Sequence, residues 1–205
     1  MANNNLVEIR QLLQEHYGLH YEENRSAELL SKLKEAAGSF NFSRTEDFIN
    51  WLLSRPLELK ELKKLAEFLT IGETYFFREP KSLQFLSENY LPELIKQRRD
   101  SKRLSIWIAG CASGEEAYTL AIMLSQLIPN ISAWDIHIHA TDINSAFLEK
   151  ARKGRFSKWS FRVTDEDFQR RYFTIESENS FQIKDSYREM LSFSYLNLAD
   201  KTFSI

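Results

Sequence analysis

The chain has 205 residues, of which 43% are hydrophobic and 27% charged, and this balance excludes disordered and fibrous classes. Its 27 basic and 29 acidic side chains give a net charge of −2, which argues against a basic nucleic-acid-binding surface. No apolar run approaches the roughly 18 residues that span a bilayer, and the polar start of the chain predicts no signal peptide. The single cysteine, Cys111, excludes an internal disulfide. We therefore expect a cytoplasmic protein that neither binds nucleic acid nor inserts into a membrane.

The first third of the chain predicts a small bundle of helices. Apolar side chains recur there at spacings of three and four residues, as amphipathic helices require. The four predicted helices cover residues 6–13, 25–37, 45–53 and 57–69. Gly38 is expected to end the second helix as its C′ glycine, and Pro56 to stop the third.

The pattern changes near residue 104 to alternating strands and helices. Leu104–Ile108 is short and largely apolar, and residues 135–140 alternate with the period of two that strands show. Helical patterns follow each of them, over residues 115–127 and 145–153. Strand, helix, strand, helix predicts parallel pairing and an open α/β sheet. Later segments predict a short helix and two strand-like pieces, over residues 165–172, 181–184 and 191–196.

A loop of small residues, Ala109–Glu116, lies between the first predicted strand and its helix. In open α/β sheets ligands bind beyond the carboxyl ends of the strands, and small residues let the backbone approach a ligand closely. The loop lacks the Gly-Lys-Ser/Thr ending of a nucleoside-triphosphate site, and Glu115 and Glu116 stand where phosphates would lie. A carboxylate there favours a cationic group, such as the ammonium of an amino-acid-like ligand. Tight packing alone would also explain the small residues.

Two further features admit two interpretations each. Asp142 follows the second strand, where an acid holds ribose hydroxyls in dinucleotide-binding folds, but it also lies close before a predicted helix that it could cap. The segment Leu69–Pro80 contains Tyr75, two phenylalanines and a lone arginine, Arg78. On spacing alone, that segment is better explained as a core plug beside a solvated charge.

Together these motifs resemble the CheR family, the bacterial chemotaxis receptor methyltransferases. The resemblance rests on the segments Thr70–Arg78, Ala109–Tyr118 and Ala140–Ile143 and on the late pair Asn197-Leu198, in the family's order and near its spacings. The domains that it implies are a helical domain at 1–72, a connecting helix region at 73–103, and a partial Rossmann-like methyltransferase domain at 104–205 with a small β-subdomain near 173–191.

The resemblance also implies a reaction. S-adenosylmethionine would donate its methyl group to glutamate carboxylates on the cytoplasmic helices of chemoreceptors or on another acidic protein. The product of the cofactor would be S-adenosylhomocysteine. Arg78 would be the catalytic residue, close to the methionine part of the cofactor and to the incoming carboxylate. Asp142 would hold the ribose, and Asn197 with Leu198 would border the adenine. The implied cofactor-binding residues are Thr74, Arg78, Ala109, Gly110, Gly114, Glu116, Asp142, Asn197 and Leu198.

The sequence departs from the family pattern in three places. Family members continue beyond Ile205 with the rest of the sheet, so we expect a truncated chain with reduced cofactor binding and activity, whose unpaired strand edges favour dimerisation. Glu176–Ser180 has no glycine, so it resembles members that do not use a receptor's C-terminal peptide. The predicted helix at Arg25–Ala37 carries few basic residues, which leaves a different protein substrate open.

Other features carry weaker hypotheses. His137 and His139 share a strand face, but no third ligand stands at a recognised spacing, so no metal site is predicted. Cys111 has no indicated His or Asp partner, and its small size explains it better than a nucleophilic role does. Two alternatives to the enzyme remain: a non-catalytic cofactor-sensing or protein-interaction module with the same fold, and a nucleotide-cofactor oxidoreductase, which Glu115 and Glu116 disfavour.

Overall fold

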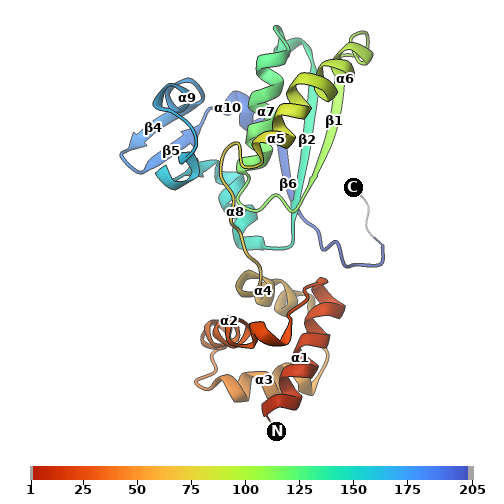
Figure 1. Ribbon diagram of the computed structural model, residues 1–205, viewed down its shortest axis with the longest axis vertical. Helices are drawn as coiled ribbons and strands as arrows, with labels where there is room; N and C mark the ends of the chain where they lie inside the picture. The colour runs from red at the N-terminus through yellow and green to blue at the C-terminus, as the bar shows by residue number, and fades with distance from the viewer. Residues whose placement is uncertain (1, 203–205) are drawn as a thin grey trace. The chain divides into compact units, whose positions relative to one another are not determined.

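The computed structural model describes residues 2–202, with side chains from residue 5 onward, and divides into two compact units (Figure 1). The helical unit contains the chain up to Ile71, together with Ile143–Ser145 and the stretch from Leu196. The α/β unit contains Gly72–Asp142 and Ala146–Tyr195. Helices and a parallel sheet in one chain confirm the predicted α/β class with preceding helices.

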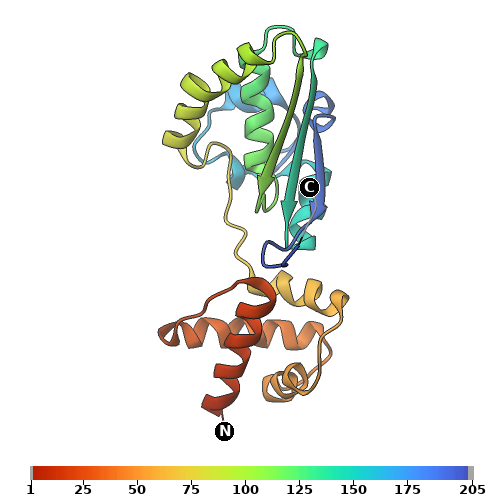
Figure 2. The same cartoon turned by 90° about the vertical axis from the view of Figure 1, so that its right-hand side faces the viewer.

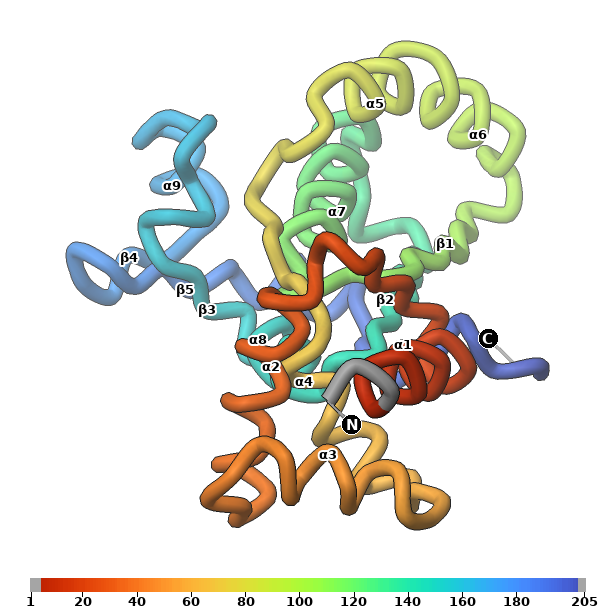
Figure 3. Tube along the Cα trace, turned by 60° about the horizontal axis from the view of Figure 1, so that its bottom comes forward, coloured from red at the N-terminus to blue at the C-terminus, as the bar shows by residue number. Residues whose placement is uncertain are grey.

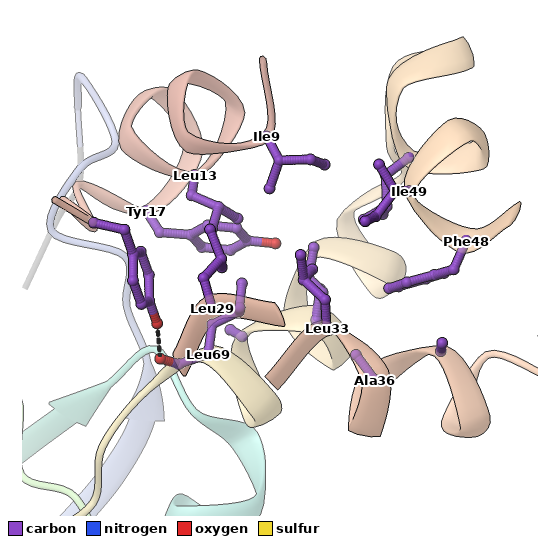
Figure 4. Packing of buried hydrophobic residues seen from close by; sticks show 14 residues of the cluster. Ile9, Leu13, Tyr17, Leu29, Leu33, Ala36, Phe48, Ile49 and Leu69 are labelled. Carbon is purple, nitrogen blue, oxygen red and sulfur yellow. Dashed lines mark hydrogen bonds between the residues drawn. The ribbon is translucent and has the colours of Figure 1, made fainter. Parts of the chain in front are cut away.

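The helical unit is built from four α-helices. They are α1 (Ala2–Tyr17), α2 (Ser26–Ser39), α3 (Thr45–Ser54) and α4 (Leu59–Leu69), with a short 3₁₀ turn, η1 (Glu23–Arg25), before α2. Their apolar faces meet in one core, where Leu13 of α1, Leu33 of α2 and Phe48 of α3 are completely buried (Figure 4). The hydroxyl of Tyr21 donates to the carbonyl oxygen of Leu69 at 2.9 Å, which ties the connection after α1 to the end of α4.

The expected end of the second helix is wrong. The helix α2 runs through Gly38 to Ser39, so Gly38 is not the C′ residue. Asn41 instead adopts the left-handed conformation, with φ of 64°, which asparagine tolerates better than most residues. The amide of Phe42 then donates to the carbonyl of Ala37 at 2.9 Å. The turn that reverses the chain is therefore made by asparagine, three residues beyond the glycine.

The main sheet of the α/β unit contains three parallel strands in the order β1 (Arg103–Ala109), β2 (Asp135–Asp142) and β6 (Leu191–Tyr195). The helix α7 (Glu115–Leu127) connects β1 to β2 and packs against one face of the sheet (Figure 2). Ile138 pairs with Ile106 on one side and Leu191 on the other, so the central strand lies in the middle of the core. The carboxyl ends of β1 and β2 therefore meet at one edge, where the candidate loop begins.

Shorter elements complete this unit. Before β1 lie α5 (Pro80–Phe85), a π-helical turn η2 (Leu86–Tyr90) and α6 (Leu91–Gln97), and between α7 and β2 lies the 3₁₀ turn η3 (Ile131–Ala133). After β2 come α8 (Ser145–Lys153), β3 (Arg155–Phe156), η4 (Lys158–Phe161), α9 (Glu166–Tyr172), β4 (Phe173–Ser177), β5 (Ser180–Ile183) and α10 (Asp185–Arg188). The strands β3, β5 and β4 form a second, antiparallel sheet, and Figure 3 shows β4, β5 and α9 grouped away from α5 and α6.

An aromatic cluster joins the second sheet to the segment before α5. Phe76 is fully buried, and its ring centroid lies 4.9 Å from that of Phe156 and 5.1 Å from those of Phe161 and Phe173. Aromatic rings at these separations pack favourably in edge-to-face and offset geometries. The core-plug interpretation of this segment therefore holds for Phe76, whereas Arg78 two residues later is exposed.

Replacing Phe76 by alanine should destabilise the α/β unit by about 3–5 kcal/mol, because it removes a buried ring and leaves a cavity. Denaturant unfolding of the full chain, followed by tryptophan fluorescence, measures the change. Phe85→Ala is the matched control, since Phe85 is 60% exposed and its loss should cost less than about 0.5 kcal/mol. Equal effects of the two substitutions would contradict the role of Phe76 as the plug of this core.

Candidate functional site

The small-residue loop is fastened to the end of β2 through its backbone. The amides of Gly110 and Cys111 both donate to the carbonyl oxygen of Thr141, at 2.8 and 3.0 Å. Gly110 and Gly114 have φ of 74° and 95°, a left-handed conformation that glycine adopts without strain. A Cβ on Gly114 would also lie 2.9 Å from that of Ala151, so this position requires glycine. Gly110 is exposed and faces open space, as a backbone cradle for a ligand does.

Asp142 closes the loop from the neighbouring strand. It is a buried residue at the end of β2, and its Oδ2 accepts a hydrogen bond from the amide of Ala112 at 2.8 Å. The helix α8 begins at Ser145, and the residue directly before it is Asn144. The carboxylate fixes the loop after β1. Its contact with a ribose stays a prediction.

The adjacent acids Glu115 and Glu116 have opposite surroundings. Glu115 is only 4% exposed, and its two carboxylate oxygens accept hydrogen bonds from the hydroxyls of Ser113 and Ser160, at 2.7 and 2.8 Å. Glu116 is exposed and lines, with Glu79, an otherwise mostly apolar cavity of about 560 Å³ between α5–α6 and β1. The structure therefore leaves Glu116 available for a cationic ligand and uses Glu115 inside the protein.

The segment that carries Arg78 is held against the first turn of α7. The amide of Phe77 donates to the hydroxyl of Thr119 at 3.3 Å, and that hydroxyl donates to the carbonyl oxygen of Glu115 at 2.7 Å. The amide of Phe76 donates to the carbonyl of Ser160 at 3.0 Å. The loop after β1 and the segment before α5 are thus brought together at the start of one helix.

Arg78 itself is exposed at the end of this segment. Its Nη1, which carries two of the five guanidinium N–H donors, donates to the carbonyl oxygen of Glu73 at 2.6 Å. Phe77 and Glu79, on either side, have φ of 57° and 22°, values that cost energy for residues with a Cβ. Such strain persists only where the surroundings enforce it, and it is typical of functional segments. Thr74, also predicted at the site, is half-buried four residues earlier.

Asn197 and Leu198 belong to the helical unit, unlike the other predicted site residues. The amide nitrogen of Asn197 donates to the carbonyl of His16 at 2.6 Å and to Asp200 at 2.9 Å, and its oxygen accepts from the amide of Ala199. Leu198 is 54% exposed. Their assignment to the adenine stays a prediction.

The two histidines share one face of β2, as the alternation predicts. His139 bonds the hydroxyls of Ser192 and Ser194 through its two ring nitrogens, at 2.9 and 3.0 Å, and His137 bonds Ser192 at 3.0 Å. Across residues 2–202 no group of three or more side chains has the arrangement of a metal site. These histidines of β2 therefore form hydrogen bonds with serines of β6.

Three buried polar residues of the site were not predicted from the sequence. Thr119, Thr141 and Ser160 each accept or donate the hydrogen bonds that join the loop, the strand end and the Arg78 segment. Ser160 lies 45 residues from Glu115 in the chain, so no local spacing signals the contact.

Comparison with known proteins agrees with this geometry. Residues 72–205 match the family model described as the CheR methyltransferase, SAM-binding domain. The chain belongs to this family. The predicted family, the cofactor S-adenosylmethionine and the class of S-adenosylmethionine-dependent methyltransferases are thereby confirmed. The open backbone at Gly110 and the exposed carboxylate of Glu116 fit a cofactor that carries an amino-acid group.

Several curated relatives are chemotaxis methyltransferases. A chemotaxis protein methyltransferase of Borreliella burgdorferi is 28% identical over 206 residues, which cover 99% of this chain and 72% of the relative. Chemotaxis protein methyltransferase 2 of Vibrio cholerae is 34% identical over 142 residues, 69% of this chain and 49% of the relative. The protein of Campylobacter jejuni subsp. jejuni serotype O:2 is 34% identical over 178 residues, 85% of this chain and 60% of the relative. The matches therefore span from about half to almost three quarters of these relatives' lengths.

The two glutamates should respond differently to the same substitution. Glu116→Gln should weaken binding of S-adenosylmethionine, because it removes an exposed charge, with little change in thermal stability. Glu115→Gln should instead lower stability by about 1–2 kcal/mol, because an amide NH2 replaces one of the two oxygens that accept hydrogen bonds from Ser113 and Ser160. Calorimetric titration and thermal unfolding of the full chain measure both. A reversed pattern would assign the cofactor contact to Glu115.

Cys111 should be almost inert in the folded protein. The pKa of the Cys111 thiol is raised to about 12, mainly by burial and secondly by the negative charge of Asp142. Because the thiolate is the reactive form, labelling by a disulfide reagent at pH 8 should be on the order of a thousandfold slower than in the unfolded chain. The rate should rise as pH approaches 12. Rapid labelling of the native chain would show that the loop opens.

Proposed function

We propose that the protein transfers the methyl group of S-adenosylmethionine to glutamate carboxylates of chemoreceptors and forms γ-carboxyl methyl esters. The names of the matched relatives support chemotaxis as the setting. The observation that carries the proposal is the chain of hydrogen bonds from Phe77 through Thr119 to Glu115, because it holds the Arg78 segment beside the loop of the cofactor domain.

The reaction asks for little proton transfer. A glutamate side chain has a reference pKa of about 4.3 and is already ionised at neutral pH. The bound cofactor supplies an electrophilic methyl group, so the protein must mainly orient the carboxylate and exclude water. Arg78 is suited to orienting a carboxylate, because a guanidinium presents paired donors that match its two oxygens.

The remaining site residues would hold the cofactor. In this proposal Glu116 pairs with the ammonium group, Asp142 accepts hydrogen bonds from the ribose, and Asn197 with Leu198 borders the adenine. Thr74, Ala109, Gly110 and Gly114 complete the lining. Among the described residues, none of the helices has the length and apolar character of a membrane span.

Association of two chains belongs to the same proposal. Within the described sheet β1 is an edge strand, since its one partner there is β2. An edge strand offers unpaired backbone groups to another chain, which supports the predicted tendency to dimerise.

Arg78→Ala should reduce methyl transfer by roughly a hundredfold or more while the fold is kept, because the carboxylate loses its orienting partner. The assay is transfer of labelled methyl from S-adenosylmethionine to receptor membranes, followed by release of methanol in base. Arg99→Ala, at an exposed arginine after α6, is the control and should match the wild type. Unchanged turnover in Arg78→Ala would exclude the role. Cofactor binding without any labelled receptor in the wild type would favour the non-catalytic module.

A further inference from the structure

The Arg78 segment is supported on one side by a second arginine, Arg162, which directly follows η4. The segment is anchored at Phe76 by the aromatic core, but Glu73 before it is exposed and Tyr75 is half-buried. These two residues need a partner to hold a defined position. Arg162 provides it.

Arg162 contacts three residues at once. Its Cζ lies 3.5 Å from the centroid of the Tyr75 ring and 4.4 Å from that of Trp159. Its Nη1 donates to the carbonyl oxygen of Trp159 at 3.1 Å, and its Nη2 lies 3.5 Å from Oε1 of Glu73. The Arg162 side chain is only 22% exposed, so these contacts are less screened than those of surface arginines. A planar guanidinium can stack and pair at the same time, and an ammonium cannot.

Both residues that Arg162 contacts before Phe76 also contact Arg78. The carbonyl of Glu73 accepts a hydrogen bond from Arg78 Nη1 at 2.6 Å, and the carbonyl of Tyr75 accepts one from the Arg78 amide at 3.3 Å. Arg162 is therefore linked to Arg78 in two ways, once through Glu73 and once through Tyr75. The strained backbone at Phe77 and Glu79 makes such outside support necessary, because a free segment would relax.

We propose that Arg162 is a positioning residue for methyl transfer, which holds Glu73 and Tyr75 so that Arg78 keeps its place. The inference rests on the proposed function of Arg78, but its structural half can be tested separately. Arg170 offers a matched control: it forms ion pairs with Glu166 and Asp167 in the same unit, and its side chain is 59% exposed.

The first test is amide hydrogen exchange of the full chain, read by mass spectrometry over residues 73–79. Arg162→Ala should speed exchange there at least about threefold, because loss of the support lets this segment open, while α1 to α4 keep their rates. Arg170→Ala should leave residues 73–79 unchanged. Wild-type exchange over residues 73–79 in Arg162→Ala would overturn the proposal, whatever the activity.

The second test is kinetic, with receptor membranes as substrate. Arg162→Ala should lower kcat about tenfold, equivalent to ~1.4 kcal/mol of transition-state stabilisation, and change the KM for S-adenosylmethionine less than about threefold. Arg162→Lys should keep part of the wild-type kcat. Tyr75→Phe should keep nearly all of it. Tyr75→Leu should resemble Arg162→Ala, and the double variant Tyr75→Leu with Arg162→Ala should lose little more. Additive losses, or a change in KM alone, would overturn the positioning role. A wild type that labels no receptor would instead refute the proposed function.

Discussion

Glu115 is the residue on which the arrangement of the site depends. It is a carboxylate almost fully removed from water, and such a group is tolerated only when its oxygens are satisfied. Ser113 satisfies one oxygen from within the loop, and Ser160 satisfies the other from η4. Through Thr119, its carbonyl is also linked to the segment before α5. Three separate stretches of chain are therefore brought together by one buried acid at the start of α7.

The elements that position the site could be predicted well, because their signals are local. The helix at 145–153 has the predicted bounds, as does the one at 115–127, and β1 and β2 extend the predicted strands by one or two residues. Periodicity and a small-residue loop suffice for these. The strand β4 was not seen in the pattern, because only Phe173 at its start is buried and the rest is exposed. The prediction that Gly38 ends α2 is wrong because the helix continues through it, and Asn41 makes the reversal.

The contacts within the site could not be predicted from the sequence, because they have no local signal. The resemblance assigns Glu116 to the cofactor, but only burial shows that its neighbour Glu115, identical in type, supports the loop. Ser160 and Arg162 lie in a stretch with no motif, and their partners are 45 and 89 residues away in the chain. The residues of the loop and Arg78 could be named from the resemblance. The side chains that hold them in place could not.

The distribution of charge supports the proposed role of Arg78. Glu116, Asp142 and Glu79 place carboxylates around the loop and the strand end, and this field suits a cofactor that carries a cationic sulfonium and an ammonium group. The same field would repel a carboxylate substrate of the proposed reaction. In the proposed reaction, a cation such as Arg78 would bring the two reactants together. The contact of Arg78 with the Glu73 carbonyl, a neutral acceptor, holds the side chain without cancelling its charge.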